Sequence, residues 1–183
     1  MPAEYPPADV RNAVHQLRTL AERTHHTADE VPFPDPYHPP RLCDLHDSAF
    51  AIARLLTYLV HDAEMTRITG AGGRRTALDR FVITELTLAA ASTGRALAAL
   101  SEVIAPAGAR AIDDTAPFDA VGNRTKRATP VELDWIQAAH AHLAATSHRL
   151  HQAADHLHTL QAPPVPAAAA PPAPHRPGPA RSP

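Results

Sequence analysis

Residues 42–63 read LCDLHDSAFAIARLLTYLVHDA, and the spacing of the apolar residues in this stretch decides the fold. These residues recur at alternating intervals of three and four positions, the pattern of a helix that packs along its whole length against other helices. No proline lies between Arg41 and Ala105, although the flanking segments are rich in proline, which disrupts helices. The sequence therefore predicts a long helix over about residues 40–68. The members of its heptad stripe are Leu42, Leu45, Ala49, Ile52, Leu56, Leu59 and Ala63.

Three further segments show helical spacing. One helix is predicted over about residues 77–105, another over about residues 130–161, and a shorter one over about residues 8–24. The 130–161 helix begins with an N-cap hydroxyl, a proline at the first helical position and a capping-box carboxylate, namely Thr129, Pro130 and Glu132. No segment shows the alternation of a strand. We therefore expect an all-α fold, an antiparallel helical bundle of three long helices plus one shorter N-terminal helix, with a coiled-coil oligomer as the alternative.

The predicted helices form one domain over residues 8–161, and the segments outside it have a different composition. Residues 1–7 precede the first helix and are predicted to be disordered. Residues 162–183, APPVPAAAAPPAPHRPGPARSP, are a low-complexity tail rich in proline and alanine, which cannot bury enough apolar surface to become ordered. Within the domain, the proline-rich segment 31–40 must be extended. Its apolar residues are expected to lie along a groove, and they are Val31, Phe33 and Tyr37.

The composition of the chain disfavours several classes of protein, including nucleic-acid-binding, secreted and membrane proteins. The formal net charge is −2, so no overall basic field favours nucleic acid or an anionic membrane. The single cysteine, Cys43, cannot form an intramolecular disulfide, and the N-terminus lacks the basic and apolar regions of a secretory signal. No uninterrupted apolar stretch has the length of a membrane span. These features indicate a cytoplasmic protein. The abundance of arginine, alanine, proline and histidine is typical of a bacterial high-GC composition.

The glycine-rich stretch TGAGGRRTAL, residues 69–78, resembles a phosphate-binding loop only superficially. It follows a helix rather than a strand, and it lacks the lysine and hydroxyl that such a loop places at fixed spacing. We interpret it as a hinge between two helices. Gly70 ends the first helix in a left-handed conformation, and Thr76 and Asp79 cap the second.

Two basic clusters are candidates for binding an anion or nucleic acid. Arg74 and Arg75 lie in the hinge, and Arg124, Lys126 and Arg127 lie in the long link before the last helix. In an up-down bundle the hinge and the link are at opposite ends. They would therefore not form one basic patch in a monomer, which disfavours binding of nucleic acid.

The last helix is rich in histidine and offers a candidate metal site. His148, His151, Asp155 and His158 fall within roughly 80° of arc beside the apolar stripe, at a spacing that suits ligands of a transition metal. A complete site needs a ligand from another helix. The alternative is that these residues only form a solvent-exposed polar edge of the helix. We expect no bound cofactor. The candidate additional ligands are His46, Asp47, Glu64 and Glu85.

Two polar residues of the last helix, His140 and Ser147, occupy core positions of its apolar stripe. A buried polar group must find a partner or cost about 1–3 kcal/mol. We expect the Ser147 hydroxyl to donate to the carbonyl of Leu143. Glu85 is the predicted partner of His140.

The 40–68 helix has a second face opposite its heptad stripe, formed by Phe50, Arg54, Tyr58, His61 and Met65. Aromatic residues at helical spacing need a cover, which is either the chain itself or another protein. We therefore predict a non-enzymatic helical-bundle protein that acts through protein–protein contacts on this face, as an accessory, adaptor or regulatory subunit or as a homodimer. The alternatives are a bundle that binds a metal or small ligand through the histidine-rich helix, and a nucleic-acid-binding accessory protein that uses the arginine-rich loops.

Overall fold

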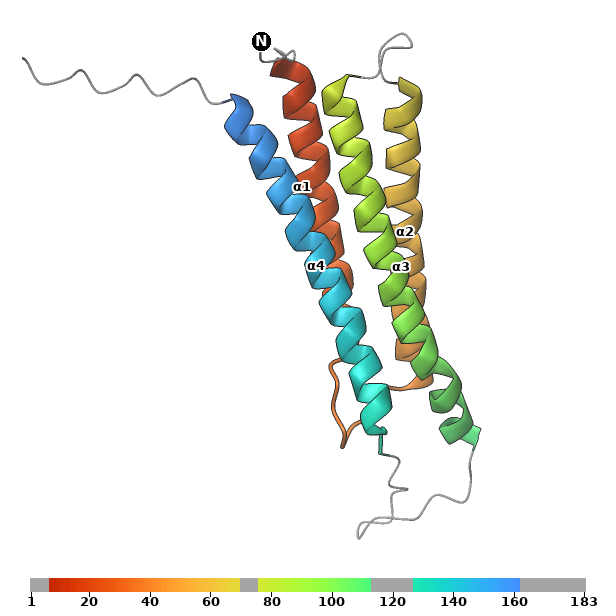
Figure 1. The fold of residues 1–183 in the computed structure, drawn as a ribbon. Coiled ribbons are helices and arrows are strands. Elements are labelled where there is room, and N and C mark those ends of the chain that lie inside the picture. Colours follow the sequence, from red (N-terminus) through yellow and green to blue (C-terminus); the bar gives the residue numbers. More distant parts are fainter. Residues whose placement is uncertain (1–6, 70–75, 113–126, 162–183) are drawn as a thin grey trace, which may run out of the picture.

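The computed structural model describes residues 7–69, 76–112 and 127–161, and these ranges form four helices without strands (Figure 1). This confirms the predicted all-α bundle, with long helices of 28, 36 and 32 residues and a shorter N-terminal helix of 23 residues. The segments predicted to be disordered, apart from Pro7, lie outside the described residues. The helices are α1 (Pro7–Asp29), α2 (Leu42–Thr69), α3 (Ala77–Ile112) and α4 (Pro130–Gln161).

Successive helices run in opposite directions (Figure 1). The helix α4 packs along both α1 and α3, and α3 also packs along α2. In contrast, α1 and α2 scarcely touch. We call the line along which two neighbouring helices meet a seam. Three of the four seams in this bundle are therefore closely packed, whereas the seam between α1 and α2 is open.

The core consists mainly of leucine, isoleucine and alanine side chains from all four helices. In α2 the predicted stripe is confirmed in part: every second member is fully buried, and the others are only half-buried. Leu55 lies outside the stripe but is also buried, at the base of the open seam toward α1. The fully buried large residues include Leu17, Leu45, Ile52, Leu59, Leu86, Leu100, Ile136, Leu143 and Leu150.

The first helix is longer than predicted, because α1 continues past Thr24 to Asp29. The apolar stripe of the sequence ends at Ala21, but buried threonines extend the same face. Thr24 is fully buried and Thr27 is 9% exposed, and the Thr24 hydroxyl donates to the carbonyl of Leu20 at 2.7 Å. Burial of the threonine methyl groups outweighs the low helix propensity of this residue type.

The predicted end of the third helix is also wrong. The sequence predicts an end at Ala105, before Pro106, but α3 continues through this proline to Ile112. Proline removes one main-chain donor and bends a helix, and the last turns of α3 do bend away from its main axis (Figure 1). Contacts on either side hold these turns: Ala107 is buried, and Arg110 reaches the first turn of α4.

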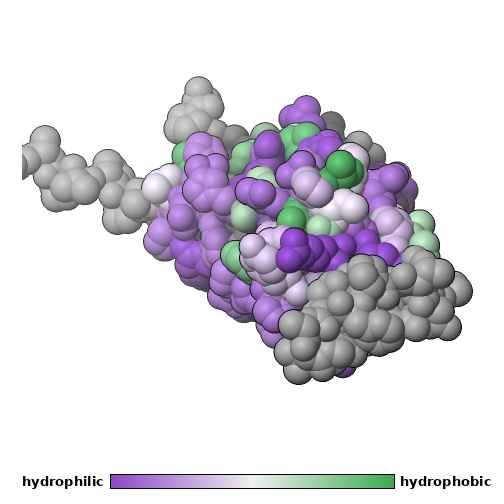
Figure 2. Space-filling model, turned by 90° about the horizontal axis from the view of Figure 1, so that it is seen from below, coloured by the Kyte–Doolittle hydropathy of each residue, from purple (hydrophilic) through white to green (hydrophobic). Residues whose placement is uncertain are grey.

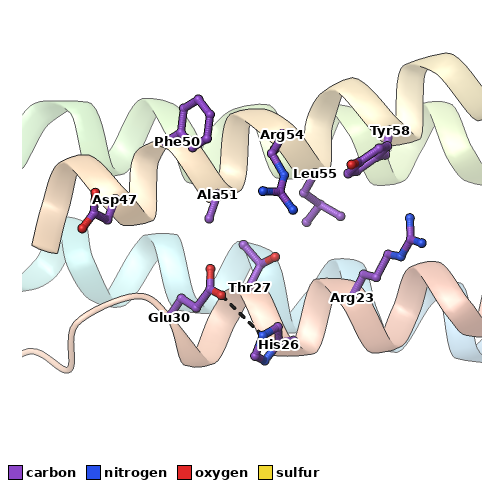
Figure 3. Close-up of a pocket in the computed structure, with 10 residues that line it drawn as sticks. All are labelled: Arg23, His26, Thr27, Glu30, Asp47, Phe50, Ala51, Arg54, Leu55 and Tyr58. Carbon is purple, nitrogen blue, oxygen red and sulfur yellow. Dashed lines mark ion pairs between the residues drawn. The ribbon is translucent and has the colours of Figure 1, made fainter.

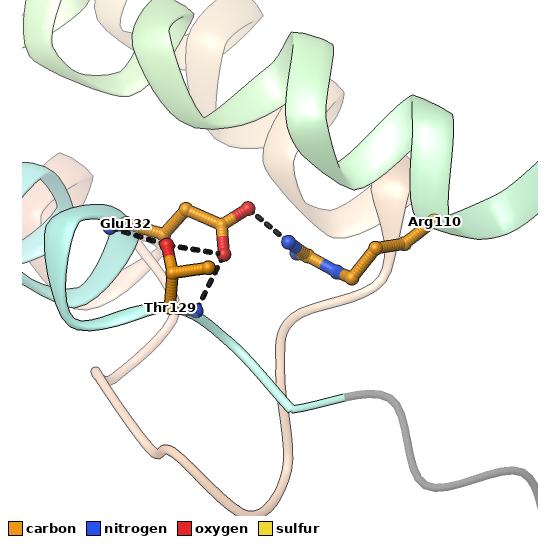
Figure 4. Close-up of polar contacts among 3 residues, drawn as sticks. All are labelled: Arg110, Thr129 and Glu132. Carbon is orange, nitrogen blue, oxygen red and sulfur yellow. Dashed lines mark hydrogen bonds and ion pairs between the residues drawn. The ribbon is translucent and has the colours of Figure 1, made fainter. Parts of the chain in front are cut away.

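The capping box predicted for α4 is confirmed (Figure 4). The main-chain N–H of Thr129 donates to Glu132 Oε2 at 2.7 Å, and the N–H of Glu132 donates to Thr129 Oγ1 at 3.3 Å. Arg110 of α3 donates to the other oxygen of the same carboxylate. Burial raises the pKa of Glu132, but the hydrogen bonds from Arg110 and Thr129 outweigh burial and hold the pKa below its ordinary value. One carboxylate thus both caps α4 and ties it to the end of α3.

Among the described helices, α3 is the one that is long and apolar enough to cross a membrane by length and composition. An 18-residue window within residues 77–111 has a mean hydropathy of 1.2. The sequence shows no uninterrupted apolar run of this length, because polar residues are spread through the helix. In the bundle α3 packs against both α2 and α4.

The extended segment 31–40 crosses the end of the bundle where α2 and α4 begin (Figure 1). Only part of its predicted burial is correct, because Val31 is buried whereas Phe33 and Tyr37 are 82% and 70% exposed. Phe33 lies beside His140, and Tyr37 lies under the guanidinium of Arg127. Seen from this end, the surface is mainly hydrophilic, with separated hydrophobic residues (Figure 2).

Candidate functional site

The second face of α2 is not covered by the part of the chain that the structure describes. Phe50 is 68% exposed, Tyr58 is 40% exposed and Met65 is 42% exposed. Arg54 and His61, which lie between them in the sequence, are exposed as well. The five residues thus form one continuous stripe on the outside of α2, which we call the α2 stripe.

Two further apolar residues of α2 are exposed. Ile68 follows Met65 by three positions and is 61% exposed, and Val60 is 55% exposed. The three-residue step from Met65 to Ile68 in the sequence was the signal that could have identified Ile68. With these additions, five of the eleven large hydrophobic residues that are exposed in the described ranges lie on α2.

Beside the α2 stripe, the open seam between α1 and α2 forms a groove with a cavity of about 420 Å³ (Figure 3). The base of the groove is formed mainly by aliphatic groups. They belong to Ala51 and Leu55 of α2 and to Thr27 of α1. Phe50 and Tyr58 lie on the α2 wall. The groove therefore has aromatic residues at its rim and aliphatic groups at its base.

One hydrogen bond from α1 and one to the residue that follows α1 connect the two walls at the ends of the groove. At one end Gln16 Nε2 donates to Asp62 Oδ2 at 3.3 Å. At the other end the Ser48 hydroxyl lies 2.9 Å from the main-chain carbonyl of Glu30. These contacts hold the two helices at a defined separation, because neither helix can move away without breaking them.

The charged residues of the groove are segregated along its length (Figure 3). Arg23 and Arg54 lie toward one end, and Glu30 and Asp47 lie toward the other. Each wall contributes one cation and one carboxylate seven positions apart. Along the groove, Arg23 lies beside Tyr58, and Arg54 lies between Glu30 and Arg23 (Figure 3). The groove is therefore basic toward one end and acidic toward the other.

The two charged groups on α2 have no ionic partner within the described residues. Arg54 and Asp47 form no ion pair there. On α1 the guanidinium carbon of Arg23 lies 5.3 Å from the ring centroid of Tyr58, and Glu30 lies 3.4 Å from His26. The groove therefore presents an uncompensated cation and an uncompensated carboxylate from α2.

A second cavity of about 780 Å³ adjoins the acidic end of the groove and shares Glu30 and Asp47 with it. Asp44 also lines this cavity, but it accepts a hydrogen bond from Arg41 Nε at 3.2 Å. That hydrogen bond lowers the pKa of Asp44. Asp44 is thus already compensated, whereas Asp47 is not.

The four candidate metal ligands on α4 do not come together with a ligand from another helix. Within the described residues no group of three or more histidine, cysteine, aspartate or glutamate side chains is arranged to hold a metal ion. Asp155 lies 3.0 Å from Arg18 of α1 instead. His148 and His158 are exposed, and His151 is half-buried. The proposed additional ligands are also separated, since Glu64 pairs with Arg67 and Glu85 with Arg149.

Most of the basic candidates lie outside the described residues, namely Arg74, Arg75, Arg124 and Lys126. Arg127 is described, and its guanidinium carbon lies 5.5 Å from the ring centroid of Tyr37. The predicted cap of the helix after the hinge is confirmed, because Thr76 and Asp79 exchange hydrogen bonds of 2.9 and 3.0 Å.

The expected partners of the two polar core residues are wrong. His140 does not pair with Glu85; its Nε2–H donates to the carbonyl of Pro32 at 3.1 Å, while Glu85 accepts from Arg149 at 2.7 Å. Ser147 donates to the carbonyl of Ala21 at 3.0 Å rather than to the carbonyl of its own helix. In both cases the partner comes from a segment distant in the sequence.

Comparisons with protein-family models, with curated proteins and with solved structures find no match to this chain. Its function is therefore inferred from the residues and their arrangement.

Proposed function

We propose that this chain is an interaction protein, an accessory, adaptor or regulatory subunit, which binds a protein partner through the α2 stripe and the adjoining groove. The observation that carries the proposal is the concentration of exposed apolar residues on α2, with Phe50, Tyr58 and Met65 in one line. Exposed aromatic and methionine side chains are enriched in protein interfaces. An intracellular location is part of the same proposal.

The chemistry of the groove supports a binding role. Aromatic side chains at its rim supply large contact areas, and arginine is the charged residue that interfaces favour most. Tyr58 and Arg23 are already in contact, which limits the freedom that they lose when a partner binds. The described residues therefore provide the elements of an interface hot spot.

The proposal is tested by charge substitutions on the stripe. The double variant Tyr58→Glu/Met65→Glu is expected to lose the partner while its helical circular dichroism stays unchanged, because both residues are exposed. The control is Val131→Glu/Leu160→Glu, which places the same charges at exposed apolar residues of α4. This control is expected to retain the partner.

The partner is detected with a photoreactive residue at Phe50, in cells that make the protein naturally, and with a second one at Leu160 for comparison. We expect one crosslinked species of defined mass from Phe50, which Tyr58→Glu/Met65→Glu removes. If the double variant loses its helicity, the face belongs to the core. Equal crosslinking from Phe50 and Leu160 would also refute the proposal.

A further inference from the structure

The spacing of the two charged groove residues of α2 indicates what occupies the groove. Asp47 and Arg54 lie seven positions apart on α2, and both line the cavity of the groove. Seven residues are two helical turns, or about 10 Å along the axis. When two copies of α2 pack in antiparallel orientation, the carboxylate of each copy lies opposite the guanidinium of the other.

This arrangement is self-complementary in the way that a two-fold symmetric interface requires, because residue i contacts residue j and residue j contacts residue i. A parallel pair of α2 helices would place Asp47 against Asp47 and Arg54 against Arg54. The sequence order of the two charges thus selects the antiparallel orientation. The same register places Phe50 and Ala51 next to the symmetry axis.

The centre of such an interface is well suited to packing. Phe50, the most exposed apolar residue of α2 at 68%, lies next to the axis, and Ala51 supplies a small side chain opposite it. Buried aromatic residues near the centre of an interface contribute most of its binding energy. The charged pairs then flank an apolar centre on both sides.

The α1 wall of the groove reinforces this pairing. The incoming carboxylate approaches the end of the groove that holds both Arg54 and Arg23, and the incoming guanidinium approaches the end that holds Asp47 and Glu30 (Figure 3). Opposite charges therefore attract between the two copies at both ends of the groove. Each copy packs α2 along the open seam of the other.

We infer that the α1–α2 groove is occupied by α2 of a second copy of this chain, with Asp47 of each copy paired to Arg54 of the other. The inference rests on the proposed function, since it names the partner of the same surface. It requires that the full chain form a dimer with twice its 19.6-kDa mass.

The test is size-exclusion chromatography with light scattering on full-length variants. Asp47→Arg and Arg54→Asp each place like charges opposite one another, and each is expected to weaken dimerisation at least about tenfold. An equimolar mixture of the two variants restores opposite charges at both pairs, so the mixture is expected to recover a heterodimer. The double variant Asp47→Arg/Arg54→Asp is expected to recover the homodimer.

The matched controls lie on α3. Glu102→Arg and Arg95→Asp change exposed residues by the same charges outside the groove, and both are expected to leave the dimer intact. Circular dichroism of every variant confirms that the helices are retained. If the controls dissociate the dimer equally, net charge rather than the specific pair is responsible and the inference fails.

Other outcomes separate this inference from the proposed function. A wild-type chain that is monomeric at about 100 µM, or a variant mixture that stays monomeric, would refute the inference. If the chain is monomeric but Phe50 still crosslinks to a different protein, the α2 stripe serves a heterologous partner and only the inference fails. If neither a dimer nor a crosslinked partner is found, both fail.

Discussion

The hydroxyl of Ser147 on α4 donates a 3.0 Å hydrogen bond to the main-chain carbonyl of Ala21 on α1, and both residues are buried. The bond crosses the seam between the first and the last helix. Ser147→Ala removes it and is expected to lower the free energy of unfolding by about 1 kcal/mol. Urea denaturation followed by circular dichroism measures the change. An unchanged midpoint would show that the bond contributes nothing to the α1–α4 seam.

A substitution in α3 is expected to act in the opposite direction. Thr93 is fully buried, and its hydroxyl has no hydrogen-bond partner among the described residues. Thr93→Val replaces the hydroxyl with a methyl group of similar size, so we expect the free energy of unfolding to rise by about 1 kcal/mol.

The matched control for this substitution is Thr146→Val. Thr146 is as deeply buried as Thr93, but its hydroxyl donates to the carbonyl of His142 at 2.8 Å. We expect no gain in stability from this change, because a satisfied hydrogen bond is lost. Equal effects of the two substitutions in the same urea titration would contradict the assignment of Thr93 as unpaired.

The capping carboxylate Glu132 is expected to make stability depend on pH. Its pKa in the folded chain lies below the ordinary value of 4.5, so its contribution is fully present above about pH 4.5 and is lost as the pH falls through the folded pKa. Glu132→Gln removes the charge from the bonds with Arg110 and Thr129. We expect a loss of about 1–3 kcal/mol at neutral pH and a smaller decline of stability toward pH 3.

The control is Glu22→Gln, which changes an exposed carboxylate of α1. It is expected to alter the free energy of unfolding at neutral pH by less than about 0.5 kcal/mol. Thermal unfolding at a series of pH values compares the two variants with the wild type. A wild-type and a Glu132→Gln curve that run parallel below pH 4.5 would contradict the linkage.

The histidines of α4 are expected not to form a stoichiometric metal site. Asp155 is engaged by Arg18, and no third ligand from another described helix approaches His148 and His151. Elemental analysis of tag-free protein incubated with zinc and then dialysed measures the content. One zinc per chain that is lost in His148→Ala/His151→Ala would overturn this expectation.

Much of the fold could be predicted because its determinants are local. The heptad spacing in α2, the absence of proline in the middle of the chain and the capping box at Thr129 each depend on residues within a few positions of one another. The helix ends at Thr24 and Ala105 were wrong for the opposite reason. Burial of Thr27 and the contact of Arg110 with α4 depend on neighbours that are distant in the sequence.

The candidate site also has a part that could be predicted from the sequence and a part that could not. Helical spacing alone identified the α2 stripe, because side chains three or four positions apart share a face of a helix. The opposite wall, with Arg23 and Glu30, could not be predicted, because the sequence does not state which helices are neighbours. The partners of Ser147 and His140 were wrong for this reason as well.

The sequence by itself determined that this chain forms four helices, where most of them begin, and which residues face outward on α2, since periodicity and capping act over one or two turns. Only the tertiary structure decided that α1 and α2 stay apart and that charged residues from both segments line the groove between them. The physical reason is that the order of helices around a bundle follows from the summed packing of all four. The order of the helices therefore cannot be read from any one segment of the sequence.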